Sequence, residues 1–230
     1  MKYLYPFNRA SIAILSVFSV LLFFTRPANG QSFTESFNDI TQLAANGWFT
    51  QNNSSPNGSI GWFQGNTIVF NANTGATDSY IGVNYNSTTL NNTISNWLLT
   101  PNRTLRNGDV FTFYSRKSSP DTHADRLEVR MSTNGASTNV GSGSTAVGDF
   151  TTLLLSINPT LILGVYPQTW TQYTITISGL PAPTSGRIAF RYYVTGGGPS
   201  GSNSDYIGID DVVYTPYVCP TITLTAGGAL

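Results

Sequence analysis

The stretch Arg126-Leu127-Glu128-Val129-Arg130-Met131-Ser132 decides the fold of this chain. Apolar and charged residues alternate along it, which is typical of a β-strand that buries one face. Leu127, Val129 and Met131 are predicted to point into a core, and the charged residues between them into solvent. Asn134-Gly135 follows directly and is a strong signal for a tight turn.

The same alternation recurs at short intervals along the chain. No segment keeps apolar residues at i, i+3, i+4 and i+7, so we expect almost no helix. Residues 51–58 and 195–204 are rich in Asn, Ser, Pro or Gly and are predicted as loops. The other predicted strands are residues 32–37, 68–70, 78–85, 94–99, 109–116, 150–157, 171–177, 187–194 and 206–214. Roughly ten short strands without helices predict an all-β fold, a two-sheet antiparallel sandwich or jelly roll.

The first thirty residues are typical of a secretory signal peptide. Lys2 and Arg9 supply positive charge, residues 10–24 form an uncharged apolar run, and small residues favour cleavage between Gly30 and Gln31. The apolar run is shorter than the roughly 20 residues that a membrane span needs. We therefore expect the mature domain to be secreted or at the cell surface, without a membrane span.

The charge balance excludes one class of partner. Charged residues make up 10% of the chain, and 11 Lys and Arg balance 11 Asp and Glu. A nucleic-acid-binding surface needs an excess of basic charge, so we expect no nucleic acid partner. Cys219 is the only cysteine, which rules out an internal disulfide and a cysteine metal site. Core packing, alone or with a bound ion, must hold the fold.

The length after residue 30 fits one sandwich domain with a substantial core. We place this domain at residues 31–215. Residues 216–230 differ in character, because Pro216 and Pro220 interrupt them before the β-type run of residues 221–225. This segment is predicted to be a linker or the start of a further, Ig-like module, with a disordered tail as the alternative.

Several short motifs occur together in a fixed order. They are Glu35-Ser36-Phe37-Asn38, Asn96-Trp97-Leu98-Leu99-Thr100-Pro101, Asp125-Arg126-Leu127-Glu128-Val129 with Ser132-Thr133-Asn134-Gly135, Arg187-Ile188-Ala189-Phe190-Arg191-Tyr192, and Ile207-Gly208-Ile209-Asp210-Asp211-Val212. With these motifs the chain resembles the bacterial choice-of-anchor J family, which is related to the cleaved-adhesin domains and more loosely to MAM-type jelly rolls. The resemblance covers nearly all of residues 32–214.

The resemblance implies a jelly roll of the concanavalin-A-like or galactose-binding-like kind. It also implies a non-catalytic, monomeric module of a larger protein that is exported or anchored at the bacterial surface, often with structural calcium. Its partner would be an extracellular glycan or a surface protein. A carbohydrate-binding accessory module, a glycan-acting extracellular enzyme and a structural spacer remain alternatives.

The sequence offers no evident catalytic set. Glu35 and Glu128 are the only glutamates, and a glycosidase needs two carboxyl groups on either side of one bond. Glu128 lies between two arginines on the predicted exposed face, as in an ordinary solvated ion-pair surface. His123 is the only histidine, too few for a zinc site, and no Gly-x-Ser-x-Gly motif accompanies it. We therefore expect no enzymatic activity.

Two tryptophans are candidates for ligand binding. Trp48 in Gly47-Trp48-Phe49 and Trp62 in Gly61-Trp62-Phe63 lie next to Asn-rich stretches, and sugar rings stack on exposed aromatic side chains. The alternative is that both pack in the core, as large aromatic side chains usually do. Trp97 and Trp170 lie in predicted strands and are expected in the core.

A structural calcium site is predicted where the first and last strands meet. Glu35 is placed between two core-directed phenylalanines, and Asp211 shares a face with Ile207, Ile209 and Val213. A buried carboxylate without a partner is costly, and a hard cation bound by oxygen ligands would remove that cost. The alternative is that Glu35 and Asp211 lie at strand ends, in solvent or bonded to turn backbone.

The family resemblance extends the predicted calcium ligands. It adds Asn38, Asp78 and Asp210 to Glu35 and Asp211.

Overall fold

The computed structural model describes residues 32–218. The predicted signal peptide, Cys219 and the β-type run at 221–225 lie outside the described residues. Within them the chain forms thirteen strands and two single-turn 3₁₀ helices, η1 (Ile40–Gln42) and η2 (Tyr85–Ser87). The near absence of helix is confirmed, and no described helix is long and apolar enough to cross a membrane.

The first sheet has six strands in the order β11-β8-β13-β5-β4, and β1 pairs with β13 outside that order. Every pairing in it is antiparallel. The strands are β1 (Phe33–Glu35), β4 (Phe63–Gln64), β5 (Ile81–Asn84), β8 (Val110–Lys117), β11 (Thr171–Thr176) and β13 (Tyr206–Thr215).

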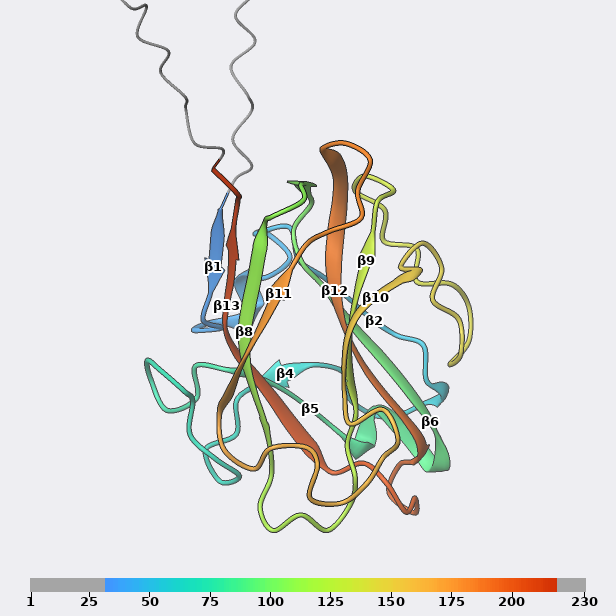
Figure 1. The fold of residues 1–230 in the computed structure, drawn as a ribbon. Coiled ribbons are helices and arrows are strands. Elements are labelled where there is room, and N and C mark those ends of the chain that lie inside the picture. The colour runs from blue at the N-terminus through green and yellow to red at the C-terminus, as the bar shows by residue number, and fades with distance from the viewer. Residues whose placement is uncertain (1–31, 219–230) are drawn as a thin grey trace, which may run out of the picture.

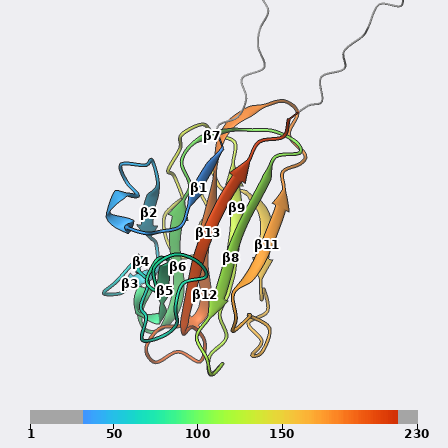
Figure 2. The same ribbon diagram turned by 90° about the vertical axis from the view of Figure 1, so that its left-hand side faces the viewer.

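The second sheet has seven strands in the order β10-β9-β12-β6-β2, with β3 paired to β6 and β7 paired to β12. It too is antiparallel throughout. The strands are β2 (Phe49–Asn52), β3 (Ser55–Asn57), β6 (Thr88–Leu99), β7 (Arg103–Leu105), β9 (Leu127–Ser132), β10 (Thr152–Ile157) and β12 (Thr184–Gly197). The two sheets face each other as a jelly-roll β-sandwich, the predicted fold class (Figures 1 and 2).

The core between the sheets comes from the alternating faces read from the sequence. Leu127, Val129 and Met131 of β9 are buried there, as predicted. Phe113 of β8 and Phe190 of β12 meet across the sandwich edge to face, with ring centroids 4.9 Å apart. Packed aromatic pairs of this geometry stabilise a core beyond the area that they bury.

Strand β13 departs from the predicted alternation. Ile207 and Ile209 are core residues, but beyond them Val212 and Tyr214 point inward. The expectation that Asp211 and Val213 share a face with the isoleucines is therefore wrong. The reason is a β-bulge: the register against β8 shifts between Asp210 and Val213, and Asp211 has a φ of +47°.

The region before β5 also differs from the prediction. Residues 68–70 form no strand, and Ile68 is 93% exposed. The two-residue strand β4 lies earlier, and residues 65–80 form a loop that packs over the outer face of the first sheet. Strands β2 and β3 lie largely within the stretch predicted as a loop at 51–58, and β7 was not predicted.

Candidate functional site

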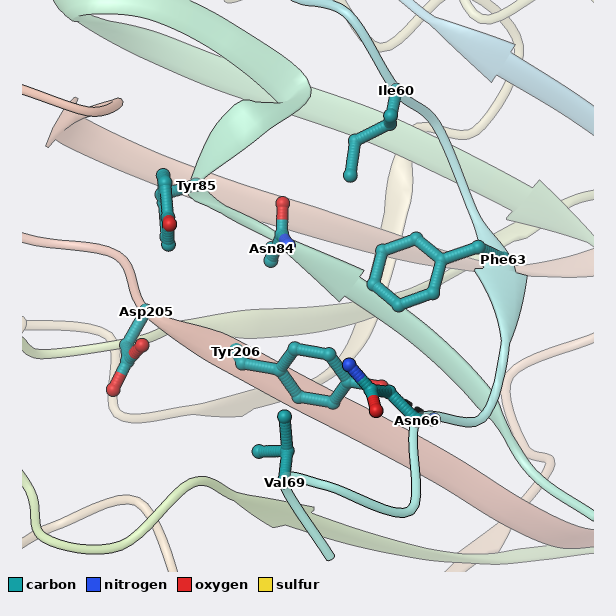
Figure 3. A pocket seen from close by; sticks show the side chains of 8 residues that line it. All are labelled: Ile60, Phe63, Asn66, Val69, Asn84, Tyr85, Asp205 and Tyr206. Atoms are coloured by element: carbon teal, nitrogen blue, oxygen red, sulfur yellow. Dashed lines mark hydrogen bonds between the residues drawn. The ribbon is translucent and has the colours of Figure 1, made fainter. Parts of the chain in front are cut away.

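An apolar groove of about 480 Å³ lies on the first sheet, where β4, β5 and β13 meet. Tyr206 and Asn84 lie at its centre, Phe63 on one side, and Tyr85 and Asp205 on the other (Figure 3). Ile60, Asn66 and Val69 complete its lining. Its size lies within the range of about 300–1,000 Å³ that is usual for small-ligand sites.

The floor of the groove is fixed by a hydrogen-bond network. The hydroxyl groups of Tyr206 and Tyr80 form a hydrogen bond of 3.0 Å. The backbone N–H of Asn66 donates to both hydroxyl oxygens, to that of Tyr206 at 3.2 Å and to that of Tyr80 at 2.8 Å. Burial raises the pKa of Tyr206 well above its usual range, so the phenol stays neutral. Phe63 meets the Tyr206 ring edge to face, with centroids 5.5 Å apart. The floor is therefore a preformed aromatic surface.

Gly82 of β5 makes room for this floor. A Cβ atom at this position would lie 2.4 Å from the Tyr206 hydroxyl and 2.9 Å from the Phe63 ring. Any larger residue would displace one of the two aromatic side chains.

One wall of the groove is formed by Tyr85 and Asp205. Tyr85 begins η2, is 37% exposed, and donates its backbone N–H to the carbonyl of Asp205 at 2.9 Å. Asn84 caps η2, because its Oδ1 accepts from the N–H of Asn86 at 2.9 Å. Its Nδ2 makes no hydrogen bond to the described residues and remains available to a ligand.

The carboxylate of Asp205 is only partly satisfied by the protein. The hydroxyl of Ser118 donates to Oδ2, whereas Oδ1 accepts no hydrogen bond within residues 32–218. The backbone N–H of Asp205 donates to Asp125 Oδ1 at 2.9 Å, which holds the residue in place. The groove thus combines aromatic surface with an amide donor and a carboxylate acceptor.

The two predicted ligand-binding tryptophans line one cavity, separate from this groove. Its volume is about 270 Å³, and Leu43, Phe49 and Ile81 contribute to it. Trp48 is 4% exposed and packs edge to face on Phe37 at 5.6 Å. Trp62 is half-buried, and its Nε1 has no hydrogen-bond partner in the described structure. Both tryptophans therefore line the same cavity and pack mainly in the core or against it. Ligand binding by Trp48 and Trp62 stays a prediction.

The other two tryptophans lie outside the central core. Trp97 of β6 is fully buried, but against Phe150 and Ala189 on the outer face of the second sheet. Trp170, one residue before β11, is half-buried against Phe70 and Tyr80 beneath loop 65–80. The expectation that Trp97 is a core residue is confirmed, although its cluster lies on the outer face of the second sheet. Trp170 is not a core residue, because it is only half-buried under the loop that covers the outer face of the first sheet.

Glu128 lies in an ion-pair network, as predicted, but not in a solvated one. Its Oε2 lies 2.7 Å from Nε of Arg130 and 3.2 Å from Nη1 of Arg191. Glu128 is 6% exposed and Arg191 is buried, since this face of the second sheet is covered. His123 contacts Thr122 through Nδ1 at 3.0 Å. Neither residue is arranged as an acid–base pair.

Asp210 and Asp211 lie where β1 meets β13, and loop 65–80 closes over them. The N–H of Asn73 donates to Asp210 Oδ2 at 2.8 Å, and the hydroxyl of Thr74 donates to Asp211 Oδ1 at 2.7 Å. The hydroxyl of Ser36, just past β1, also donates to Asp211, at 3.0 Å. Burial and the adjacent Asp211 raise the pKa of Asp210 to about 7.

The remaining predicted calcium ligands are dispersed around this pair. The carboxylate of Glu35 accepts a hydrogen bond from the N–H of Phe37 at 2.9 Å, and burial raises the pKa of Glu35. Asn38 lies beside loop 65–80, since a Cβ on Gly75 would come within 3.5 Å of its Oδ1. Asp78 is exposed. Within residues 32–218, no three acidic, histidine or cysteine side chains gather as a metal-binding group, so calcium stays a prediction.

The groove residues could not be recognised from the sequence, because they carry no motif. Phe63 and Asn66 are 139 or more positions from Asp205 and Tyr206, and only the pairing of β5 with β4 and β13 brings them together. Tyr85 was assigned to the end of a strand, whereas it begins η2. The nearest signal in the sequence is the adjacent aromatic pair Trp62-Phe63, of which Phe63 lines the groove.

No protein-family model and no curated protein matches this chain. Among solved structures, it is similar to the K1 cleaved adhesin domain of Lys-gingipain from Porphyromonas gingivalis, with 24% identity, a TM-score of 0.53, and coverage of 82% of this chain and 99% of that one. The K3 domain of the same protein gives 22% identity and a TM-score of 0.51, with 81% and 99% covered. These likenesses confirm an adhesin-like jelly-roll fold, and the choice-of-anchor J assignment stays a prediction.

Proposed function

We propose that this protein is an exported, non-catalytic module that binds a glycan outside the cell. The observation that carries the proposal is the groove between Phe63 and Tyr85. Ligand sites combine apolar and aromatic lining with a few fixed polar groups. Here Phe63, Tyr85 and Tyr206 offer ring faces or edges for the C–H surface of a sugar, and Asn84 and Asp205 offer an amide donor and a carboxylate acceptor for its hydroxyl groups.

The surroundings of the groove support binding without catalysis. Asp205 is the only acidic residue that lines it, while hydrolysis of a glycosidic bond requires two carboxyl groups flanking that bond. Glu128 is held between Arg130 and Arg191. The proposal therefore assigns recognition to the groove and no bond cleavage.

Export and calcium belong to the same proposal. The signal-peptide pattern of residues 1–30 supports export. For calcium, the fit rests on Asp210 and Asp211, two adjacent carboxylates that form no ion pair with Lys or Arg within the described residues. Ser36 and Thr74 place hydroxyl oxygens beside Asp211. Oxygen atoms of this kind are the ligands that calcium prefers, and the ion would fasten loop 65–80 to β13.

The test is a binding screen of the purified protein on immobilised polysaccharides, followed by calorimetry with the oligosaccharide that binds. Tyr85→Ala and Phe63→Ala are expected to weaken binding at least tenfold. Phe49→Ala is a matched control, because Phe49 is exposed to the same degree as Tyr85 (36% against 37%) but lines the tryptophan cavity.

The outcomes separate the alternatives. If only Phe49→Ala lost binding, the glycan site would be the cavity lined by Trp48 and Trp62 instead of the groove. Release of reducing sugar by the wild-type protein would contradict the non-catalytic assignment. A protein that binds no glycan would leave a surface protein as the partner or a spacer as the role, and would refute the glycan proposal.

A further inference from the structure

A second hollow lies on the far side of Tyr85 and Asp205. It measures about 380 Å³ and shares these two residues with the groove of Figure 3. Thr122 and His123, from the β8–β9 connection, line it together with Gly198 and Pro199, from the β12–β13 connection. Tyr85 and Asp205 thus stand between two adjoining hollows rather than at the end of one.

Building on the glycan site assigned above, we propose that both hollows form one binding surface for an extended, uncharged oligosaccharide. One part of the oligosaccharide would lie against Phe63 and Tyr206, and the next sugar residues would pass Tyr85 to reach His123. Asp205, between the two hollows, would accept hydrogen bonds from sugar hydroxyl groups and reject acidic sugars.

The second hollow is as firmly built as the first. The N–H of Gly198 donates to the Ser204 hydroxyl at 2.9 Å, and the N–H of Ser204 donates to the carbonyl of Ala124 at 2.8 Å. Gly198 has a φ of +99°, and a Cβ there would lie 2.1 Å from the carbonyl of Leu90. Only glycine fits this turn, so its shape is set before a ligand arrives. A preformed surface loses little conformational freedom on binding, which favours affinity.

The position of Asp205 is fixed from below by a buried ion pair. Asp125 accepts the backbone N–H of Asp205 and lies 2.9 Å from Lys117 Nζ. Lys117 is fully buried and is also paired with Asp121, so its charge is neutralised beneath the surface. Asp205 therefore keeps its place when a ligand binds on either side.

The charges around the two hollows favour an uncharged chain. Asp205 and His123 are the only charged or titratable lining residues besides the two tyrosines, and no Lys or Arg lines either hollow. A uronic acid or a sulfated sugar would bring a negative charge towards the Asp205 carboxylate with no cation to offset it. Like charges at short range disfavour a complex. A neutral sugar instead supplies hydroxyl donors to the free Oδ1.

The experiment is calorimetry with neutral oligosaccharides of two to six residues from the cello-, manno-, xylo- and galacto-series, and with oligogalacturonate as the acidic probe. The wild-type protein is expected to bind a tetrasaccharide or longer chain at least tenfold more tightly than the disaccharide of that series. His123→Ala is expected to weaken tetrasaccharide binding several-fold and to leave disaccharide binding unchanged. Ser202→Ala is the control, because Ser202 is exposed in the β12–β13 connection that forms the other side of the second hollow but lines neither hollow.

The Asp205→Asn variant tests the charge selection, since it keeps the size of the side chain. It is expected to bind oligogalacturonate at least tenfold better than the wild-type protein does. Equal affinity for short and long chains, together with no effect of His123→Ala, would overturn the two-hollow surface while leaving the glycan groove intact. Tight binding of oligogalacturonate by the wild-type protein would overturn the selection against acidic sugars. Failure of every oligosaccharide to bind would refute the glycan function and this proposal with it.

Discussion

Lys117 Nζ lies 2.9 Å from Asp125 Oδ2, and both side chains are completely buried. The hydroxyl of Tyr192 and the N–H of Asp205 also donate to Asp125. This one carboxylate therefore links the end of β8, the middle of β12 and the start of β13. Breaking a buried pair leaves an uncompensated charge, which costs more than the pair itself contributes.

Lys117→Met is expected to lower the free energy of unfolding by about 3–5 kcal/mol, because Asp125 would remain buried without its cation. Urea unfolding followed by tryptophan fluorescence measures the loss. The double variant Lys117→Met/Asp125→Asn removes both charges and should recover part of it. If the double variant is less stable by the sum of the two single losses, the two side chains are not energetically coupled.

The stability of the calcium-free protein is expected to depend on Asp210 between about pH 4 and 7. In the folded protein burial raises the pKa of this carboxyl group to about 7, against 3.8 as its ordinary value. The folded state therefore holds the proton more tightly, so the contribution is complete below pH 3.8 and is lost as the pH rises to 7. Thermal melting in chelator, for the wild-type protein and Asp210→Asn, should show this slope only in the wild type. The same slope in both proteins would contradict the assignment.

Added calcium is expected to raise the melting temperature, more strongly above pH 7, where Asp210 is ionised, than at pH 5. An ion that binds only the folded state at 100 times its Kd adds about 2.7 kcal/mol. Asp211→Asn should reduce the response, and asparagine tolerates the positive φ at this position as aspartate does. Asp149→Asn is the control, because Asp149 is bonded instead to Asn134 and Ser137 on another loop. A melting temperature that changes with neither calcium nor chelator would refute the calcium site.

Gly82→Ala is expected to destabilise the protein by about 1–3 kcal/mol, the usual cost of inserting a methyl group into packed surroundings. It should also weaken glycan binding, because the new methyl group would push Tyr206 or Phe63 out of place. Gly61→Ala is the matched control. Its Cβ would meet only Asn96 Nδ2 at 3.9 Å, so stability and binding should hardly change. Unchanged binding by a folded Gly82→Ala protein would show that the aromatic floor does not set the affinity.

The sandwich could be predicted from the sequence because alternation in β8, β9, β11 and β12 reflects burial on one face. Where a second layer covers the outer face, that signal fails. Glu128 and Arg191 are buried although they point away from the core between the sheets, and Trp97 is buried on the outer face of its sheet. Local alternation reports only which residues share a face, and it does not report what covers that face.

The candidate sites were less predictable for two physical reasons. A bulge adds one residue to β13, and this reverses the faces after Asp210 in a way that period-two counting cannot detect. The groove depends on long-range pairing, since Phe63 reaches Tyr206 only after β4, β5 and β13 have joined one sheet. By contrast, the meeting of β1 with β13 was predicted correctly, and Glu35 lies opposite Val212 in that pairing.

The direction of β13 has a mechanical consequence. Tyr206 begins the strand and Asp205 directly precedes it, whereas Tyr214 lies beside Phe33 at the far end, where the first and last described residues come together (Figure 1). At roughly 3.3 Å per residue, the ten-residue strand separates the two ends by about 30 Å. A pull between a ligand held at Asp205 and a tether at the far end would load β13 lengthwise. Its hydrogen bonds to β5, β8 and β1 would then resist together in shear, instead of opening one after another.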